Sequence, residues 1–187
     1  MKQILMLIAV FFITLSCQSS GGKKVTEITT PVEEKVSVET GIEIGQRAPE
    51  LVFESPDGEK IAITSLRGQM VLIDFWASWC SPCRMENPRL VKTYHHFKDS
   101  SFKEGEGFTV YGVSLDKSKE NWMAAIKADK LEWEAHVSDL KGWHSVPAAM
   151  YGVQGIPTNF LIDGKGIIVA KSLRGEFLDQ ELERLLK

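Results

Sequence analysis

The segment "MVLIDFWASWCSPCRMENP", residues 70–88, decides the fold of this chain. Its first part, 70–77, is nearly all apolar, as expected of a central strand that is covered on both faces. Beyond this strand, over residues 81–97, which extend past the quoted segment, apolar residues recur at helical spacing. A buried strand therefore runs almost directly into a helix, and Cys80 and Cys83 lie where the helix begins.

The placement of the two cysteines favours redox chemistry. A helix N-terminus exposes unpaired backbone N–H groups and carries positive dipole charge. A thiolate there is stabilised, so the pKa of Cys80 should fall below the value of about 8.5 of a free thiol. We expect Cys80 to be exposed and anionic, and Cys83, one turn further along, to be sheltered. This asymmetry suits thiol–disulfide exchange, in which one thiol attacks and the other resolves.

Two other interpretations of the cysteine pair have less support. A structural disulfide would close only a very short loop and gain little loop-closure entropy. A zinc site needs four ligands, usually two such pairs or one pair with nearby histidines. No second CxxC motif follows, and the four histidines show no suitable spacing (His95, His96, His136 and His144). We therefore expect no metal and no dissociable cofactor, because the cysteine pair itself stores two electrons.

The rest of the pattern predicts an α/β domain over residues 44–187. Further strands are expected twice within 51–63 and at 108–115, 158–163 and 166–171, with helices at 118–130, 145–151 and 176–187. This order of strands and helices predicts a central mixed β-sheet with helices on both faces. Hydrophobic residues make up 43% of the chain, which is enough for a core without disulfides. A net charge of -3 without a basic stripe argues against a nucleic-acid partner.

The N-terminus predicts a leader and a tether. Lys2 precedes an apolar run, 4–15, that is shorter than the roughly 20 residues of a membrane-spanning helix. A positive start and a short apolar run are typical of a secretory signal, and a buried core helix is the alternative. Residues 18–43 are rich in Ser, Gly, Lys, Thr and Glu, so we expect a flexible tether there.

The end of the apolar run, "ITLSC", resembles a bacterial lipoprotein signal. The resemblance implies a signal peptide over 1–17 and lipid attachment at Cys17, although Thr14 stands where that pattern prefers Leu. Attached acyl chains would anchor the protein to a bacterial membrane, facing the periplasm or the outside. Cys80 and Cys83 would then form the remaining pair, in a compartment where disulfides persist.

Several motifs together resemble the thioredoxin-fold oxidoreductases. These are "VLIDFWASWCSPCRMENP", 71–88, and "GVQGIPTNFLIDGKGIIVAKSLRGE", 152–176. With the leader, they resemble the membrane-tethered TlpA/ResA branch over 44–187. The resemblance implies a thioredoxin-like fold, with Cys80 as nucleophile and Cys83 as resolving cysteine.

The same resemblance assigns residues around the pair. It implies that Trp79 packs beside the thiols and that Pro157 is a cis-proline facing them. The preceding residue, Ile156, would offer its backbone to a substrate chain, which pairs with it like an added strand. Pro88 matches the proline that kinks the long helix, because proline lacks the N–H that a helix interior needs.

Two carboxylates complete the candidate site. Asp74 is the only charged residue of the apolar strand, and desolvation should raise its pKa and make it a proton acceptor near neutral pH. It occupies the place of the buried aspartate of thioredoxin, which serves the resolving thiol; TlpA/ResA relatives often lack this acid. Glu86 matches a glutamate that ResA-like proteins keep beside the active site. The alternatives are a hydrogen-bonded core Asp74 without a catalytic task and a helix-surface Glu86 favoured by the dipole.

The expected function is thiol–disulfide exchange on exported proteins. The resemblance favours the reducing direction, with apocytochromes c among the possible clients, and it requires an electron donor in the membrane that the sequence does not identify. A peroxidase of the peroxiredoxin kind is the first alternative, but residues 76–80, "WASWC", do not provide its PxxxTxxC setting. A module that binds unfolded exported chains, with incidental thiols, is the second.

Overall fold

The computed structural model describes residues 38–187. Seven strands form one mixed sheet in the spatial order β2-β1-β7-β6-β3-β8-β9. Their bounds are Val52–Glu54 (β1), Lys60–Ala62 (β2), Met70–Trp76 (β3), Phe108–Ser114 (β6), His136–Ser138 (β7), Thr158–Ile162 (β8) and Ile168–Lys171 (β9). The helices are Ser81–Phe97 (α1), Lys119–Ala128 (α2), Val146–Met150 (α3) and Glu176–Leu185 (α4), with 3-10 turns at Ile63–Leu66 (η1) and Gly142–His144 (η2). Ser101–Phe102 (β4) and Gly105–Glu106 (β5) pair as a separate ribbon.

The central strand is β3, as predicted. It pairs in parallel with β6 and antiparallel with β8. All seven of its residues are buried, which explains why the sequence lacks the alternation of a half-exposed strand. The strand ends four residues before Cys80, so the end of the central strand determines where the two cysteines lie relative to the sheet.

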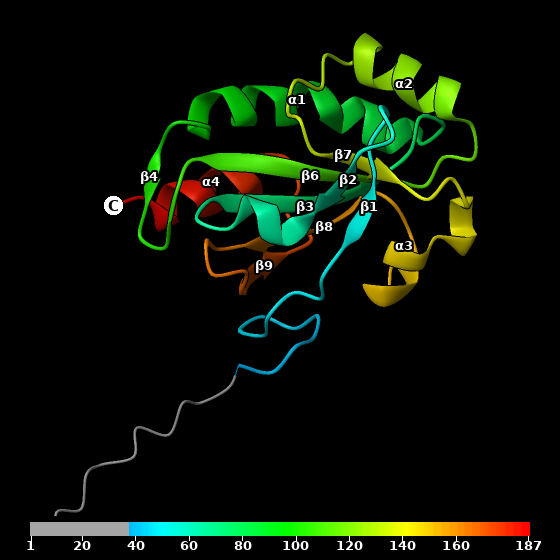
Figure 1. The fold of residues 1–187 in the computed structure, drawn as a ribbon. Helices are drawn as coiled ribbons and strands as arrows, with labels where there is room; N and C mark the ends of the chain where they lie inside the picture. The colour runs from blue at the N-terminus through cyan, green and yellow to red at the C-terminus, as the bar shows by residue number, and fades with distance from the viewer. Residues whose placement is uncertain (1–37) are drawn as a thin grey trace, which may run out of the picture. The chain divides into compact units, whose positions relative to one another are not determined.

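Helices cover both faces of the sheet, which confirms the predicted layering. In Figure 1, α1 and α2 lie on one side of the strands and α3 lies on the other. The hydroxyl of Thr93 on α1 donates to the Asp179 carboxylate on α4 over 2.5 Å, so α4 is on the α1 side. On the opposite face the Phe75 ring packs against Tyr151, with ring centroids 5.4 Å apart. Because side chains alternate along a strand, Asp74 must point toward α1.

The structure adds elements that the sequence pattern did not predict. Strand β7 inserts between β1 and β6, and the ribbon of β4 and β5 follows α1. These strands have only two or three residues, too few for a hydrophobic period to be recognised. Helix α2 is shorter than the predicted 118–130, although Ser118 caps it as expected by accepting the Asn121 N–H at 3.2 Å.

The first described residues are bonded to the domain. Arg47 donates its N–H to the Glu39 carbonyl at 2.9 Å, and the Lys171 ammonium donates to the Ile42 carbonyl at 3.1 Å. The last residues of the predicted tether, 18–43, belong to the described part of the chain, and two of them, Glu39 and Ile42, are hydrogen-bonded to the domain. The predicted signal peptide and Cys17 lie outside the described residues. Within 38–187, no helix has the length and apolar character needed to cross a membrane.

Candidate active site

The two cysteines open helix α1 and are joined by a disulfide, with Cα atoms 5.3 Å apart. Cys80 is the N-cap residue, and its Sγ accepts the backbone N–H of Cys83 at 3.2 Å. The predicted helix start at Ser81 is confirmed. An N–H donor and the helix dipole both favour negative charge at the Cys80 sulfur once the disulfide opens.

The expected exposure of Cys80 is wrong for this disulfide form. Cys80 is 5% exposed and Cys83 is 2% exposed, so both are buried. The Cys80 sulfur is bonded to Cys83 on one side and lies 3.8 Å from the Ile156 carbonyl oxygen on the other. The two cysteines therefore differ in their position, since Cys80 is the N-cap residue and Cys83 lies within the first turn of the helix. Their exposed fractions are similar.

The proline turn faces the cysteine pair as the resemblance implies. The Ile156–Pro157 peptide bond is cis, and Pro157 lines the same pocket as Cys83. The Thr158 hydroxyl donates to the Gly155 carbonyl at 2.7 Å across this turn. The Ile156 backbone is thus beside the sulfur that would react, which is the place where a substrate chain could add as a strand.

Trp79 lies at the surface beside the cysteines, with 53% of its area exposed. Its ring centroid is 6.1 Å from that of Trp143, which is 51% exposed. Both rings line a surface pocket with a volume of about 580 Å³, together with Lys117 and His144. The sequence left Trp143 unassigned, because only the tertiary structure brings η2 next to the Trp79 loop.

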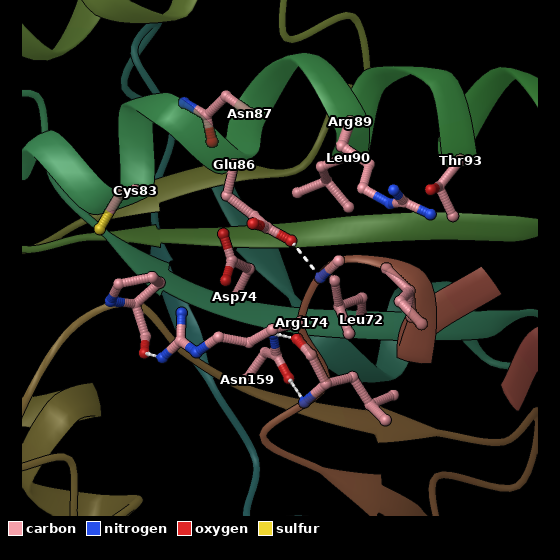
Figure 2. A pocket seen from close by; sticks show the side chains of 14 residues that line it. Leu72, Asp74, Cys83, Glu86, Asn87, Arg89, Leu90, Thr93, Asn159 and Arg174 are labelled. Carbon is pink, nitrogen blue, oxygen red and sulfur yellow. Dashed lines mark hydrogen bonds between the residues drawn. The ribbon is translucent and has the colours of Figure 1, made fainter. Parts of the chain in front are cut away.

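A second pocket lies behind Cys83, between α1, β3, β8 and the turn that precedes α4. Figure 2 shows Asp74 and Glu86 directed into it, with the Arg174 side chain passing beneath Asp74. Its volume is about 20 Å³, comparable to the space one water molecule needs. The structure therefore brings Asp74, Cys83 and Glu86 together in one small enclosure.

Asp74 is 7% exposed, and burial raises its pKa to about 7. The positive charge of Arg174 opposes this rise, and the negative charge of Glu86 adds to it. The predicted direction is confirmed. A carboxylate with this pKa can both accept and release a proton near neutral pH.

Glu86 connects two helices. Its Oε1 accepts the backbone N–H of Gly175 at 2.6 Å, and Gly175 is the N-cap residue of α4. Gly175 has φ +55° and offers no side chain as a cap, so the Glu86 carboxylate supplies an acceptor at this helix end. Glu86 is half-buried, unlike the helix-surface residue that was the alternative.

The loop before Cys80 is held by residues that the sequence pattern did not indicate. Asp116 is 1% exposed and accepts the Ser78 N–H at 2.9 Å and the Ser78 hydroxyl at 2.5 Å. Arg84 donates to the Ser78 carbonyl at 3.1 Å and forms an ion pair with Asp129. One signal was present in the sequence: Asp116 follows the strand that neighbours β3, where polar residues of parallel strands converge.

Within residues 38–187, no three side chains of His, Cys, Asp or Glu come together as ligands of a metal would. The site offers two sulfurs and, in the pocket behind Cys83, the carboxyl groups of Asp74 and Glu86. A sulfur pair at a helix N-terminus, a proline turn opposite it and a titrating carboxylate behind it form an arrangement suited to thiol–disulfide exchange.

Comparison with known proteins places this site in a family. A model described as the AhpC/TSA family matches residues 44–171. The chain belongs to this family. The ResA thiol-disulfide oxidoreductase of Bacillus cereus is 30% identical over 151 residues, covering 81% of each chain. The thioredoxin-like protein YneN of Bacillus subtilis is 34% identical over 130 residues, covering 70% of this chain and 71% of that protein.

The solved structures agree with this assignment. The thioredoxin domain of a thiol-disulfide oxidoreductase from Bacteroides vulgatus is 37% identical, with a TM-score of 0.70, and the match covers 79% of this chain and 100% of that one. The predicted thioredoxin-like fold is confirmed. The protein is a thiol-disulfide oxidoreductase of the ResA type, and its structure contains a Cys80–Cys83 disulfide.

Proposed function

We propose that this oxidoreductase reduces disulfides in exported proteins through a mixed disulfide on Cys80 that Cys83 resolves. The observation that carries the proposal is the position of the Cys80 sulfur. It accepts the Cys83 N–H at the start of α1 and lies 3.8 Å from the Ile156 carbonyl. The first contact favours a thiolate at Cys80, and the second supports the proposal that a substrate chain would pair with the Ile156 backbone beside this sulfur.

The exchange has two steps. The Cys80 thiolate attacks one sulfur of the substrate disulfide, a bond forms between them, and the second substrate sulfur leaves and takes up a proton. Cys83 then gives its proton to the Asp74 carboxylate, and its thiolate attacks the Cys80 sulfur. The first substrate sulfur leaves as a thiolate and is protonated in turn. Two electrons have moved to the substrate, and the enzyme holds the disulfide present in this structure.

The first experiment traps the intermediate. A Cys83→Ser variant cannot resolve, so it should accumulate a covalent adduct with a disulfide substrate such as insulin, visible on a non-reducing gel. Wild type should accelerate the reduction of insulin by dithiothreitol, and Cys80→Ser should leave the rate at that of dithiothreitol alone. Equal rates of insulin reduction with wild type and Cys80→Ser would instead support the alternative of a binding module with incidental thiols.

A peroxidase remains the second candidate, because the matching family model carries the AhpC/TSA description. Peroxiredoxins need Thr and Pro upstream of the reactive cysteine, and residues 76–80 lack them. We expect Cys83→Ser to consume hydrogen peroxide no faster than Cys80→Ser. Peroxide turnover by Cys83→Ser at the rate of a known peroxidase would replace the exchange proposal.

The cellular setting belongs to the same proposal. Lipid on Cys17 would hold the domain at a bacterial membrane, facing the periplasm or the outside, within reach of a membrane electron donor. Exported proteins with thiols or disulfides, apocytochromes c among them, would be its substrates. Fractionation of cells that express wild type or Cys17→Ser tests the anchor, since only wild type should stay with the membranes. The reduction potential of the Cys80–Cys83 couple tests the direction.

A further inference from the structure

The turn between β9 and α4 forms the rear wall of the pocket behind Cys83, and strand β8 holds it. The Asn159 side chain accepts the Leu173 N–H at 2.8 Å and donates to the Leu173 carbonyl at 2.7 Å. The Ser172 N–H donates to the Asn159 carbonyl at 2.9 Å. The next two residues of the turn, Arg174 and Gly175, are therefore fixed between β8 and α1.

Arg174 uses this fixed position to contact the proline turn. Its Nη2 donates a hydrogen bond to the carbonyl oxygen of Pro157. Figure 2 shows the Arg174 side chain passing beneath Asp74. Arg174 thus bonds to the residue that follows Ile156 and lines the same pocket as Asp74, the acid behind Cys83.

Few other charges face Asp74. Helix α1 presents Cys83, Glu86 and Arg89 to the pocket, and β8 presents the neutral Asn159. The Arg89 guanidinium is engaged by the Asp179 carboxylate at 2.8 Å. Among the residues lining the pocket, Arg174 is therefore the cation that acts on Asp74, against the negative charge of Glu86.

We propose that Arg174 is a positioning residue of the exchange reaction, which joins the substrate-binding proline turn to the proton-accepting carboxylate through one guanidinium. The inference rests on the proposed function, because it assigns Asp74 the proton of Cys83. Holding the Pro157 carbonyl keeps the positive charge beside Asp74, where it favours the ionised carboxylate that can take that proton. The same bond keeps the proline turn at the distance from Cys80 that a substrate strand requires.

The size of the effect follows from the exposure of Arg174. A nearby cation lowers the pKa of a carboxylate by about 1–3 units. Arg174 is exposed, so water screens the attraction, and the lower end of this range applies. Loss of the charge would then raise the Asp74 pKa by about one unit and reduce the ionised fraction at pH 7 roughly fivefold.

The test compares Arg174→Gln, which removes the charge, with Arg174→Lys, which keeps it. Arg184→Gln is the matched control, since Arg184 lies on α4, its side chain is 62% exposed and its guanidinium pairs with Glu181. The Asp74 carboxyl is titrated by carbon NMR in the oxidised protein, so the readout needs no activity. We expect its midpoint to rise in Arg174→Gln and to stay near the wild-type value in Arg174→Lys and Arg184→Gln.

A second readout is the rate at which Cys83 resolves a preformed mixed disulfide, followed across pH. Arg174→Gln should move the midpoint of this profile upward and slow resolution about fivefold at pH 7. In an Asp74→Asn background the same change should leave the profile unaltered. An unchanged Asp74 midpoint in Arg174→Gln overturns the inference, as does an equal shift in Arg174→Lys. Absence of exchange by wild type would refute the proposed function instead, while the NMR titration would still decide the role of Arg174.

Discussion

Asp116 accepts both the backbone N–H and the hydroxyl of Ser78, two residues before Cys80. The backbone that precedes the reactive sulfur is therefore held by a residue just after β6, the strand beside β3, in addition to its own helix. Arg84 completes the arrangement by donating to the Ser78 carbonyl. A site that must present a sulfur to a protein substrate gains from such fixed geometry, because a preorganised group loses less entropy when it reacts.

Replacing Asp116 with Asn should destabilise the protein and slow the reaction of Cys80. The Asn amide keeps one oxygen acceptor, but its NH2 group faces one of the two Ser78 donors, the backbone N–H or the hydroxyl. That half-buried donor then has no acceptor. We expect the free energy of unfolding to fall by about 1–3 kcal/mol. Urea denaturation measures the loss, and the alkylation rate of reduced Cys80 measures the effect on the loop. Asp99→Asn is the control, since the Asp99 side chain is 88% exposed, and equal losses in both variants would contradict the assigned role.

Asp74→Asn should stabilise the protein at neutral pH. The folded-state pKa of Asp74, about 7, lies above the unfolded value of 3.8, so wild-type stability falls as pH rises through this interval. An Asn side chain does not ionise, so the variant avoids the free-energy cost of burying a charged carboxylate. The variant should exceed wild type by up to about 4 kcal/mol above pH 7, and the difference should vanish below pH 4. Denaturation curves of the oxidised proteins at several pH values measure this, and a constant difference across pH would contradict it.

His136 should give the opposite trend. It is 5% exposed, and burial lowers its pKa to about 4 from 6.5. The native state disfavours the charged imidazole, so wild type loses stability as pH falls from 6.5 toward 4. Relative to His136→Gln, the loss should reach about 3 kcal/mol at pH 4. The same denaturation series checks it, and parallel curves for the two proteins would show that His136 does not titrate in this interval.

Glu86 should act on Asp74 with a sign opposite to that of Arg174. Glu86→Gln keeps an oxygen for the Gly175 N–H and removes only the charge, so the Asp74 pKa should fall. Glu86→Ala removes the acceptor as well and should further reduce the free energy of unfolding by about 1 kcal/mol through the lost cap. Carboxyl titration and urea denaturation separate the two effects. A rise of the Asp74 pKa in Glu86→Gln would refute this account.

Trp143→Ala should weaken the use of polypeptide substrates. The ring is half-exposed beside Trp79, so its loss should change the free energy of unfolding by only about 0.5 kcal/mol. We expect KM for insulin to rise several-fold, because an apolar contact surface is lost, while the rate with a small aromatic disulfide stays unchanged. Ile44→Ala, at a residue that is 61% exposed, provides the control. An equal loss with both kinds of substrate would place Trp143 outside substrate recognition.

Much of the fold was predictable because its signals are local. The segment 70–77, apolar except for Asp74, predicted a strand covered on both faces, and helix α1 spans the expected residues. The raised pKa of Asp74 was predictable as well, since a single acid in a buried strand has to lose its water. Strand β7 was not predictable, because three residues owe their conformation to the neighbours β1 and β6 and not to a pattern of their own.

By itself, the sequence determined that two sulfurs lie at the start of a helix directly after a buried strand, because strand and helix each follow from short-range periodicity. Only the tertiary structure decided what surrounds those sulfurs. It brought Ile156 to Cys80, Glu86 to Gly175 and Arg174 to Asp74, across separations of more than 75 residues. Contacts of this kind depend on how the sheet orders its strands, and no local pattern of residues encodes that order.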